Sequence, residues 1–346
     1  PSEEMKQITK YLTTSIFFVV GVVLIYFVYR QFPLKTVLET FNKATPFPVI
    51  LFITVSLVIM ILQAWRWDVI LKTAKVKVPF HKVFLYKIVG FGISFITPFA
   101  KVGGEPLRAG LLAKHDCSFE KGMSTVVIDK IIDLAATGFM FALGVFVALN
   151  HLMVPESLKI VLIIISLVFL GMIARVYYQL LNNKTMVVRL FKMFRLHKIP
   201  KLKRFENALA SVDRRIIDFH KKETRAFYKT VAISVAAWLL MFVEYKSVLW
   251  IFGYDLTILQ LFTIITIMGA AYIFPIPLAL GIFEFGQAQT FSMLGLKAAA
   301  GIGLSIIIRA RDLMWTVFGI IILLAHGKSF KKAYMTTVKQ TKLPTQ

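Results

Sequence analysis

Cysteine and acidic residues are scarce in this sequence. The single cysteine, Cys117, excludes an intramolecular disulfide framework. No pairing of histidine with cysteine has the ligand spacing of a zinc site, so we expect no metal. The glycine-rich segment GGEPLRAG lacks the Gly-Lys-Ser/Thr of a phosphate-binding loop, so we expect neither ATP hydrolysis nor a bound cofactor.

The shortage of acidic residues leaves a strongly basic chain. Lysine and arginine total 41 against 18 acidic residues, which gives a net charge of +23. In a soluble protein this balance would indicate nucleic-acid binding. Here the basic residues lie between long apolar segments and form no stripe along a soluble domain, so we expect no nucleic-acid partner. Basic loops of this kind are retained on the cytoplasmic side of a membrane.

Apolar residues make up 58% of the sequence and gather in blocks near the length that spans a bilayer. Backbone in hydrocarbon must satisfy its own hydrogen bonds, so we expect helices throughout. The sequence therefore predicts an all-α polytopic membrane protein with one integral membrane domain over residues 1–346. The expected crossings are Tyr11–Tyr29, which we take as a retained span and not a cleaved signal, Val49–Trp65, Val126–Leu149, Leu158–Tyr178, Thr230–Phe252 and Ser305–Ala325.

Two further apolar blocks, Val83–Ala100 and Leu259–Leu280, are broken by glycine and proline. Basic loops flank the first block on both sides, so it cannot simply cross the membrane. We expect it to enter from the cytoplasm and return, and the second block to enter from outside and return there. Six crossings and two re-entrant hairpins then place both termini in the cytoplasm. We expect the membrane to be the plasma membrane of the cell.

The two halves of the chain match each other at a shift of 179 residues. Pro98 and Pro277 correspond at this shift, and so do Glu105 and Glu284. Further matches are Gly90 with Gly269, Gly122 with Gly301, Lys130 with Arg309 and Asp133 with Asp312. We expect repeats over residues 11–149 and 158–326, each with three crossings and one hairpin. Three is an odd number, so the repeats insert with opposite orientation, the inverted plan of many secondary transporters.

The second repeat holds a polar insert over residues 182–229. Its apolar residues, from Leu202 to Phe219, recur at helical spacing. This pattern predicts an amphipathic helix on the inner membrane surface. A solvated cytoplasmic hairpin is the alternative.

The hairpin tips contain the residues that reverse a chain. In the first tip Pro98 ends the entering half-helix, and Gly103 and Gly104 permit a tight reversal. Pro275, Pro277 and Gly281 act likewise in the second tip. The returning half-helix of the first hairpin would aim free N–H groups and a positive dipole end into the protein.

Charged residues inside spans cost roughly 2.5–3.5 kcal/mol each on insertion and indicate function by default. Two triads related by the repeat are expected, Glu105/Lys130/Asp133 and Glu284/Arg309/Asp312. The alternative is that Glu105–Lys130 and Glu284–Arg309 are buried ion pairs that only hold each hairpin to its span. The residues that break the repeat are the better ligand candidates, namely Lys101, Arg108, Asp129 and Arg311. The cations among them suit a phosphate, because they are expected to be unpaired and to lie beside a helix N-terminus.

Two other polar groups are expected to have no role in the site. Glu244 and Lys246 lie late in a span, and we expect them to extend to the membrane interface. Trp65 and Trp67 flank Arg66 at the expected start of a basic loop, where they resemble an aromatic anchor.

The segments GISFITPFAKVGGEPLRAG and VVIDKIIDL resemble the transmembrane region of lysylphosphatidylglycerol synthase/flippase proteins, as do FPIPLALGIFEFGQAQ and IIIRARDL. The resemblance covers roughly Tyr11 to Ala325. It implies a domain that moves a lipid between leaflets. The aminoacyl transfer of the synthase members uses a separate soluble domain, and only about twenty polar residues follow Ala325, so that activity is not implied.

We therefore expect a lipid flippase, and not an enzyme, that takes an anionic, aminoacylated or other phosphate-bearing phospholipid. Its phosphate is expected near Lys101, Arg108 and Arg311. One alternative is a membrane enzyme acting on a lipid-linked substrate, with Asp129 and Asp133 as acid and base or as ligands of a divalent ion. Another is an accessory scaffold for a partner transferase. A homo-oligomer is compatible with each.

Overall fold

A computed structural model describes residues 45–97, 103–151, 156–182, 185, 188–189, 206–271 and 281–325. These residues form helices and contain no strand, as predicted for an all-α protein. The helices are α3 Pro46–Thr73, α4 Phe80–Ile96, α5 Glu105–Leu111, the short 3₁₀ helix η1 Leu112–His115, α6 Phe119–His151, α7 Glu156–Leu181, α10 Glu206–Lys222, α11 Thr224–Ile251, α12 Ile258–Ala271, α13 Ile282–Met293 and α14 Ala298–Ala325.

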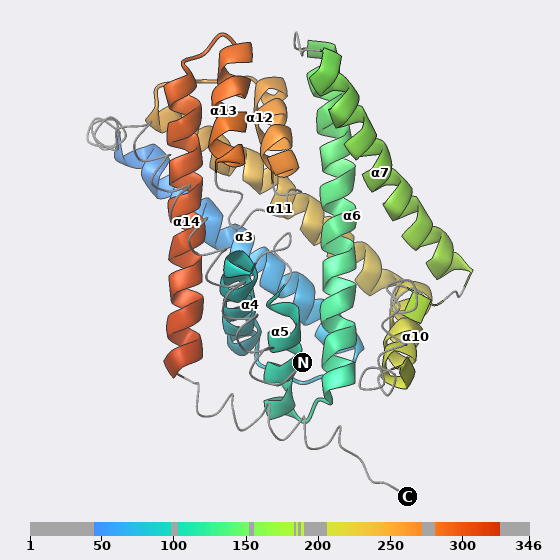
Figure 1. The fold of residues 1–346 in the computed structure, drawn as a ribbon. Helices are drawn as coiled ribbons and strands as arrows, with labels where there is room; N and C mark the ends of the chain where they lie inside the picture. The colour runs from blue at the N-terminus through green and yellow to red at the C-terminus, as the bar shows by residue number, and fades with distance from the viewer. Residues whose placement is uncertain are drawn as a thin grey trace, which may run out of the picture.

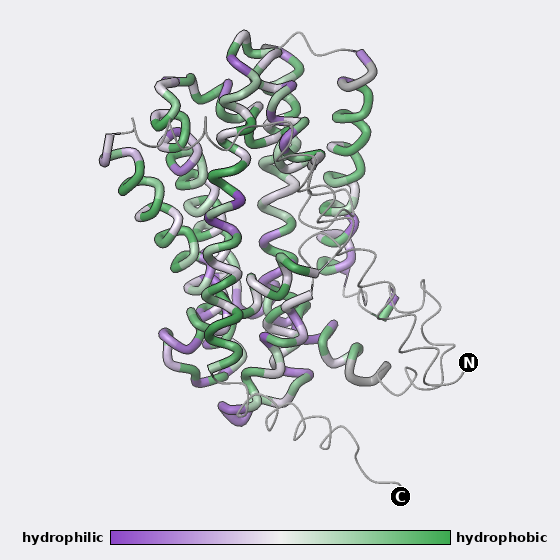
Figure 2. The backbone as a smooth tube through the Cα atoms, turned by 60° about the vertical axis from the view of Figure 1, so that its left-hand side comes forward, coloured by the Kyte–Doolittle hydropathy of each residue, from purple (hydrophilic) through white to green (hydrophobic). Residues whose placement is uncertain are grey.

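Helices α3, α6, α7 and α11 are each long and apolar enough to cross a membrane, which confirms four of the expected crossings. Helix α14 has 28 residues, a length of about 42 Å at 1.5 Å per residue. It carries Arg309, Arg311 and Asp312 within its apolar sequence. Figure 2 shows hydrophobic residues along the long helices, with hydrophilic segments inside the bundle as well as at its ends.

The centre of the bundle is an antiparallel pair formed by α3 and α11, which cross the molecule side by side (Figure 1). Their contacts fix the register. The rings of Phe47 and Trp250 lie 6.4 Å apart at one end. Further along, the Arg66 guanidinium donates to the Ser234 hydroxyl at 3.0 Å. The two upright helices α6 and α14 stand on either side of this pair (Figure 1).

Two helical hairpins enter the bundle from opposite ends (Figure 1). Helices α4 and α5 lie at the end where α6 begins, and α12 and α13 lie at the end where α14 begins. Each returning half-helix packs on the long helix that follows it, α5 on α6 and α13 on α14. Each entering half-helix packs on the long helix of the other half, α4 on α14 and α12 on α6. The two halves are therefore interlocked.

Glycines bring these helices into backbone contact. A Cβ placed on Gly319 of α14 would lie 2.7 Å from the carbonyl oxygen of Ile88 in α4. On the other side of the contact, a Cβ on Gly92 would lie 3.0 Å from the carbonyl oxygen of Thr316. Both distances are too short for a methyl group without movement. The entering half-helix α4 therefore packs against α14 with the two backbones in direct contact.

The helix bounds follow the sequence repeat. Adding 179 to α3 gives residues 225–252, beside α11 at Thr224–Ile251, and adding 179 to α5 gives residues 284–290, inside α13. Figure 1 shows α3 and α11 running in opposite directions, as α6 and α14 do. The complete inverted repeat stays a prediction, since the first expected crossing, Tyr11–Tyr29, lies outside the described residues.

Helix α10 in the polar insert is amphipathic, as its spacing predicted, but its apolar side does not face lipid. Val212, Ile216 and Phe219 are buried together with Ile128 and Ile132 of α6. The buried carboxylate of Asp213 accepts a hydrogen bond from the Val188 amide at 3.0 Å. The apolar face of α10 therefore packs against the bundle, and the position of the insert on the inner membrane surface stays a prediction.

Candidate functional site

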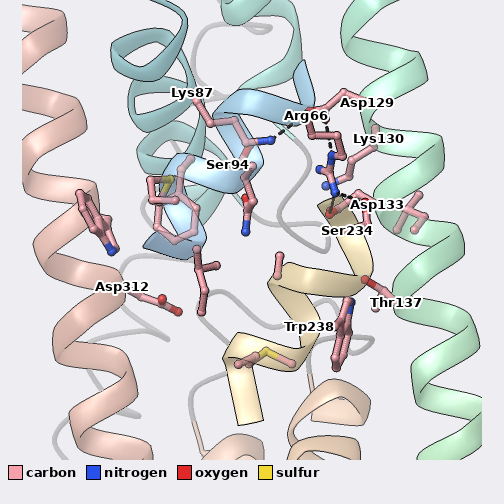
Figure 3. A pocket seen from close by; sticks show the side chains of 18 of the residues that line it. Arg66, Lys87, Ser94, Asp129, Lys130, Asp133, Thr137, Ser234, Trp238 and Asp312 are labelled. Atoms are coloured by element: carbon pink, nitrogen blue, oxygen red, sulfur yellow. Dashed lines mark hydrogen bonds and ion pairs between the residues drawn. The ribbon is translucent and has the colours of Figure 1, made fainter. Parts of the chain in front are cut away.

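A cavity of about 470 Å³ lies between the two hairpins, within the bundle. It is lined by residues of the helices α3, α4, α5, α6, α11, α12 and α14, together with Phe169 of α7. Figure 3 shows the side chains converging from these helices. The charged residues among them are Arg66, Lys87, Glu105, Arg108, Asp129, Lys130, Asp133, Glu244, Arg311 and Asp312. An apolar bundle thus encloses a strongly charged space.

Asp129 of α6 is the centre of one charge cluster. Its Oδ1 accepts a hydrogen bond from Arg66 Nε of α3 at 2.7 Å. Its Oδ2 accepts from Lys87 Nζ of α4 at 2.9 Å and from Arg108 Nη2 of α5 at 2.9 Å. Asp129 is 1% exposed, and cations from three separate elements surround it. Because a buried ion requires such partners, Asp129 joins the first hairpin to α3 and α6.

Arg66 extends the cluster across the cavity wall. Its Nη1 donates to Asp133 Oδ1, one turn along α6, at 2.8 Å. Figure 3 shows Arg66, Asp129 and Asp133 together, with Ser234 of α11 beside them. The guanidinium thus makes charge-assisted hydrogen bonds to both carboxylates, an arrangement that fixes its position.

Arg108 is held by shape as well as by charge. Its guanidinium carbon lies 4.0 Å from the ring centroid of the buried Trp67, in cation–π geometry. Its aliphatic chain fits over Gly90, where an added Cβ would lie 2.4 Å from Arg108 Cδ. The absence of a side chain at Gly90 therefore makes room for Arg108.

A second cluster lies at α11 and α14. Arg311 donates through Nη1 to Glu244 Oε2 and through Nη2 to Asp312 Oδ1, the latter at 2.8 Å. Glu244 is 1% exposed and Asp312 is also 1% exposed. Figure 3 shows Asp312 across the open space from Arg66 and Asp133. The two clusters thus occupy different walls of one cavity.

Each hairpin is also fastened by a glutamate at its tip. Glu105 Oε2 accepts a hydrogen bond from the Gly103 amide at 2.7 Å and Glu105 Oε1 lies 3.4 Å from Lys130 Nζ. In the second hairpin Glu284 Oε2 accepts from the Gly281 amide at 2.8 Å, and Glu284 also pairs with Arg309. The expected pairs Glu105–Lys130 and Glu284–Arg309 are thus both present. Neither Glu284 nor Arg309 is among the residues that line the cavity.

We expect Glu284→Gln to destabilise the protein more than Glu105→Gln does. The Glu284 side chain is 3% exposed and binds arginine through both oxygens, whereas Glu105 is 12% exposed and meets Lys130 at a longer distance. Breaking the deeper pair should cost about 3 kcal/mol and the shallower pair about 1 kcal/mol. Thermal unfolding in detergent measures both, and an equal or reversed order contradicts this assignment.

A match to the family described as "Lysylphosphatidylglycerol synthase TM region" covers residues 14–320. The chain belongs to this family. Membership agrees with the resemblance carried by the hairpin segments and makes the chain a multi-pass membrane protein of lipid metabolism or transport.

Relatives in archaea extend over most of the chain. A UPF0104 membrane protein of Methanothermobacter thermautotrophicus is 24% identical over 247 residues, which cover 68% of this chain and 73% of the relative. A UPF0104 membrane protein of Pyrococcus horikoshii is 23% identical over 334 residues, 90% of this chain and 96% of the relative. These names state a membrane location and no activity.

The expected triads are divided differently in the structure. Asp133 accepts a hydrogen bond from Arg66, and Asp312 accepts one from Arg311. Each of these carboxylates therefore belongs to one of the two charge clusters that line the cavity. The prediction of unpaired cations is wrong, since Arg108 bonds Asp129 and Arg311 bonds Glu244. Buried charges require partners, which the spacing along one helix could not identify.

The amides at the first tip are not free either. The Gly103 amide bonds Glu105 and the Gly104 amide bonds the Ser94 hydroxyl at 2.9 Å. The predicted array of free N–H groups is therefore wrong at these two positions. The residues Pro98, Lys101, Pro275 and Pro277 lie outside the described residues, and their predicted roles stay predictions.

Three site residues escaped the sequence analysis. Arg66 was placed in a basic loop with Trp65 and Trp67 as an anchor, but α3 continues to Thr73 and Arg66 is 2% exposed. Glu244 was expected at the interface and is instead buried beside Arg311. Lys87 was not singled out, although it is a cation inside an expected hairpin. The cost of an intramembrane charge is the signal that applied to all three.

Proposed function

We propose that this protein moves a phospholipid between the two leaflets of a membrane, with the headgroup passing through the charged cavity. The observation that carries the proposal is the cavity itself, a space of about 470 Å³ lined by both charged and apolar side chains inside an apolar bundle. A lipid headgroup in the bilayer centre needs polar partners to replace water. The family match supports a role with lipids.

The cavity also offers an apolar side, which acyl chains require. Leu134, Phe169 and Met241 line the same space as the charged groups. A small cavity of about 30 Å³ adjoins it and shares Phe169, Thr137 and Trp238 with it. Leu134 of α6 is 46% exposed, so part of this apolar side is accessible. A lipid can thus keep its chains on this side while its headgroup meets the charges.

The proposal assigns no covalent chemistry to the protein. Asp129 and Asp133, considered above as acid, base or metal ligands, are both bonded to Arg66. Carboxylates engaged in this way serve to hold the helices and the cations in place. Energy comes from a gradient or from downhill lipid movement, and the proposed location is the plasma membrane with both termini in the cytoplasm.

Reconstitution into liposomes tests the proposal. Lipids labelled on the acyl chain keep their headgroups intact, and a membrane-impermeant quencher reports how fast label from the inner leaflet becomes accessible. We expect the wild-type protein to raise this rate above that of protein-free liposomes. Arg108→Gln, which removes a cation from the cavity, should lower the accelerated rate by at least about tenfold.

A surface variant provides the matched control. Lys246 pairs with Asp255, whose side chain is 75% exposed, and it does not line the cavity. Lys246→Gln should therefore translocate lipid at the wild-type rate. If wild-type protein that unfolds cooperatively on heating leaves the rate at the protein-free value for every lipid tried, the proposal is wrong.

A further inference from the structure

We infer that the cavity selects a headgroup with one phosphate and one primary ammonium, the phosphate lying beside Arg108 and the ammonium beside Glu244. This inference rests on the proposed function and narrows its substrate class. A phosphoethanolamine headgroup has this chemistry.

The two sides of the cavity carry formal charge of opposite sign. The wall around Asp129 holds Arg66, Lys87, Arg108 and Lys130 against Glu105, Asp129 and Asp133, which leaves it one positive charge in excess. The wall at α14 holds Arg311 against Glu244 and Asp312, which leaves it one negative charge in excess. Figure 3 shows Asp312 on the wall opposite Asp129 and Lys130. The cavity is neutral as a whole but has a positive and a negative side.

Two polar atoms of the residues that line the cavity have hydrogen-bonding capacity that the protein itself does not use. Arg108 Nε, a donor, and Glu244 Oε1, an acceptor, are buried and have no hydrogen-bond partner within the part of the chain that the structure describes. Arg108 is 5% exposed and Glu244 is 1% exposed, and both line the cavity. An unsatisfied buried donor or acceptor is costly. One of these atoms lies on each side, and each matches the sign of its wall.

A phosphate and a primary ammonium are the groups that would satisfy these two atoms. A phosphate oxygen accepts from Arg108 Nε, and Lys87 has further N–H donors beside its bond to Asp129. A primary ammonium donates to Glu244 Oε1. A trimethylated ammonium has no N–H to donate, so Glu244 discriminates against a choline headgroup.

A purely anionic headgroup would satisfy only one of the two sides of the cavity. A glycerol headgroup brings a phosphate for Arg108 but no cation for the wall of Glu244 and Asp312. Glu244 Oε1 would then remain unsatisfied in a buried position, which costs about 1.4 kcal/mol or more and corresponds to at least about tenfold in rate or affinity.

The test compares three acyl-labelled lipids in liposomes of constant bulk composition, with ethanolamine, choline and glycerol headgroups. We expect wild-type protein to translocate the ethanolamine lipid at least about tenfold faster than either of the others. Glu244→Gln removes the excess negative charge, so it should reduce the preference for ethanolamine over glycerol by about tenfold. Lys246→Gln should keep the wild-type preference.

A binding measurement covers the case in which Glu244→Gln does not fold. Soluble phosphoethanolamine should raise the unfolding temperature of wild-type protein in detergent more than equal concentrations of glycerol phosphate or phosphocholine do, because a ligand stabilises the state that binds it. Equal translocation of the three lipids, or equal stabilisation by the three soluble headgroups, overturns this inference while the proposed function stands. Failure to move any lipid overturns the proposed function itself.

Discussion

Replacing Asp129 with asparagine is expected to lower the free energy of unfolding by about 3–5 kcal/mol, the cost of removing one partner from a buried ion network. The change leaves Arg66 with Asp133 but deprives Lys87 and Arg108 of the carboxylate oxygen that they share. These cations belong to three elements, α3, α4 and α5. The first hairpin should therefore detach from its neighbours, and thermal unfolding in detergent should show a large decrease in melting temperature.

Removal of one cation should restore part of this loss. The double variant Asp129→Asn with Lys87→Met leaves one fewer buried charge without a partner. We expect it to unfold at a higher temperature than Asp129→Asn alone, with a coupling energy of about 1 kcal/mol or more between the two positions. Lys87→Met in the wild-type background provides the fourth corner of the cycle. A double variant less stable than Asp129→Asn contradicts the assigned network.

The neighbouring carboxylate is the matched control. Asp133 lies one turn from Asp129 on the same helix, but its side chain is 39% exposed, whereas that of Asp129 is 1% exposed. Partial contact with solvent screens the charge that its removal would expose. Asp133→Asn should cost about 1 kcal/mol or less. A cost equal to that of Asp129→Asn would show that burial is not the deciding factor.

The contrast between these two aspartates indicates what the sequence could and could not predict. Both were identified as intramembrane charges, because the spacing of four residues and the apolar surroundings are visible in the sequence. The partner of both, Arg66, was not identified. It follows an apolar block and precedes several lysines, so the rule that assigns basic residues to cytoplasmic loops applied to it equally well. Only the packing of α3 against α6 and α11 shows that it is buried.

The hairpins illustrate the same limit at a larger scale. Prolines, glycines and flanking basic loops predicted two re-entrant elements at opposite ends, and α4/α5 and α12/α13 lie there (Figure 1). The exchange of partners, in which α4 packs on α14 and α12 on α6, was not predicted. Local signals specify where a chain turns, whereas contacts between halves depend on side chains that meet only in the folded bundle.

The difference between the halves is the part of the repeat most relevant to function. Glu105 and Glu284 correspond, and each binds a cation and a tip amide. The residues at the cavity centre do not correspond. A shift of 179 takes Arg66 to Tyr245 and Asp129 to Ile308. The matched glutamates thus hold the hairpins, while the unmatched cations Arg66, Lys87 and Arg108 give the wall around Asp129 its excess of positive charge.

The packing of the first hairpin leads to the second large effect, at Gly104. A Cβ at this position would lie 2.0 Å from the carbonyl oxygen of Gly90 in α4. Gly104 has ordinary dihedral angles, φ −84° and ψ −10°, so glycine is required there for space and not for conformation. Gly104→Ala must separate α4 from α5, which should cost about 3 kcal/mol, the upper end of overpacking. It should also move Arg108, four residues along, away from Asp129 and slow lipid translocation.

Gly110, in the same short helix, tests whether the effect is one of space. A Cβ there meets nothing within 4 Å. Gly110→Ala should stabilise the protein slightly, by up to about 1 kcal/mol, because alanine favours a helix more than glycine does. The same chemical change in helix α5 and its cap is thus expected to act in opposite directions. The melting temperatures of the two variants in detergent test this. If both variants lose stability to a similar extent, the contact with Gly90 is not the reason that glycine is needed at position 104.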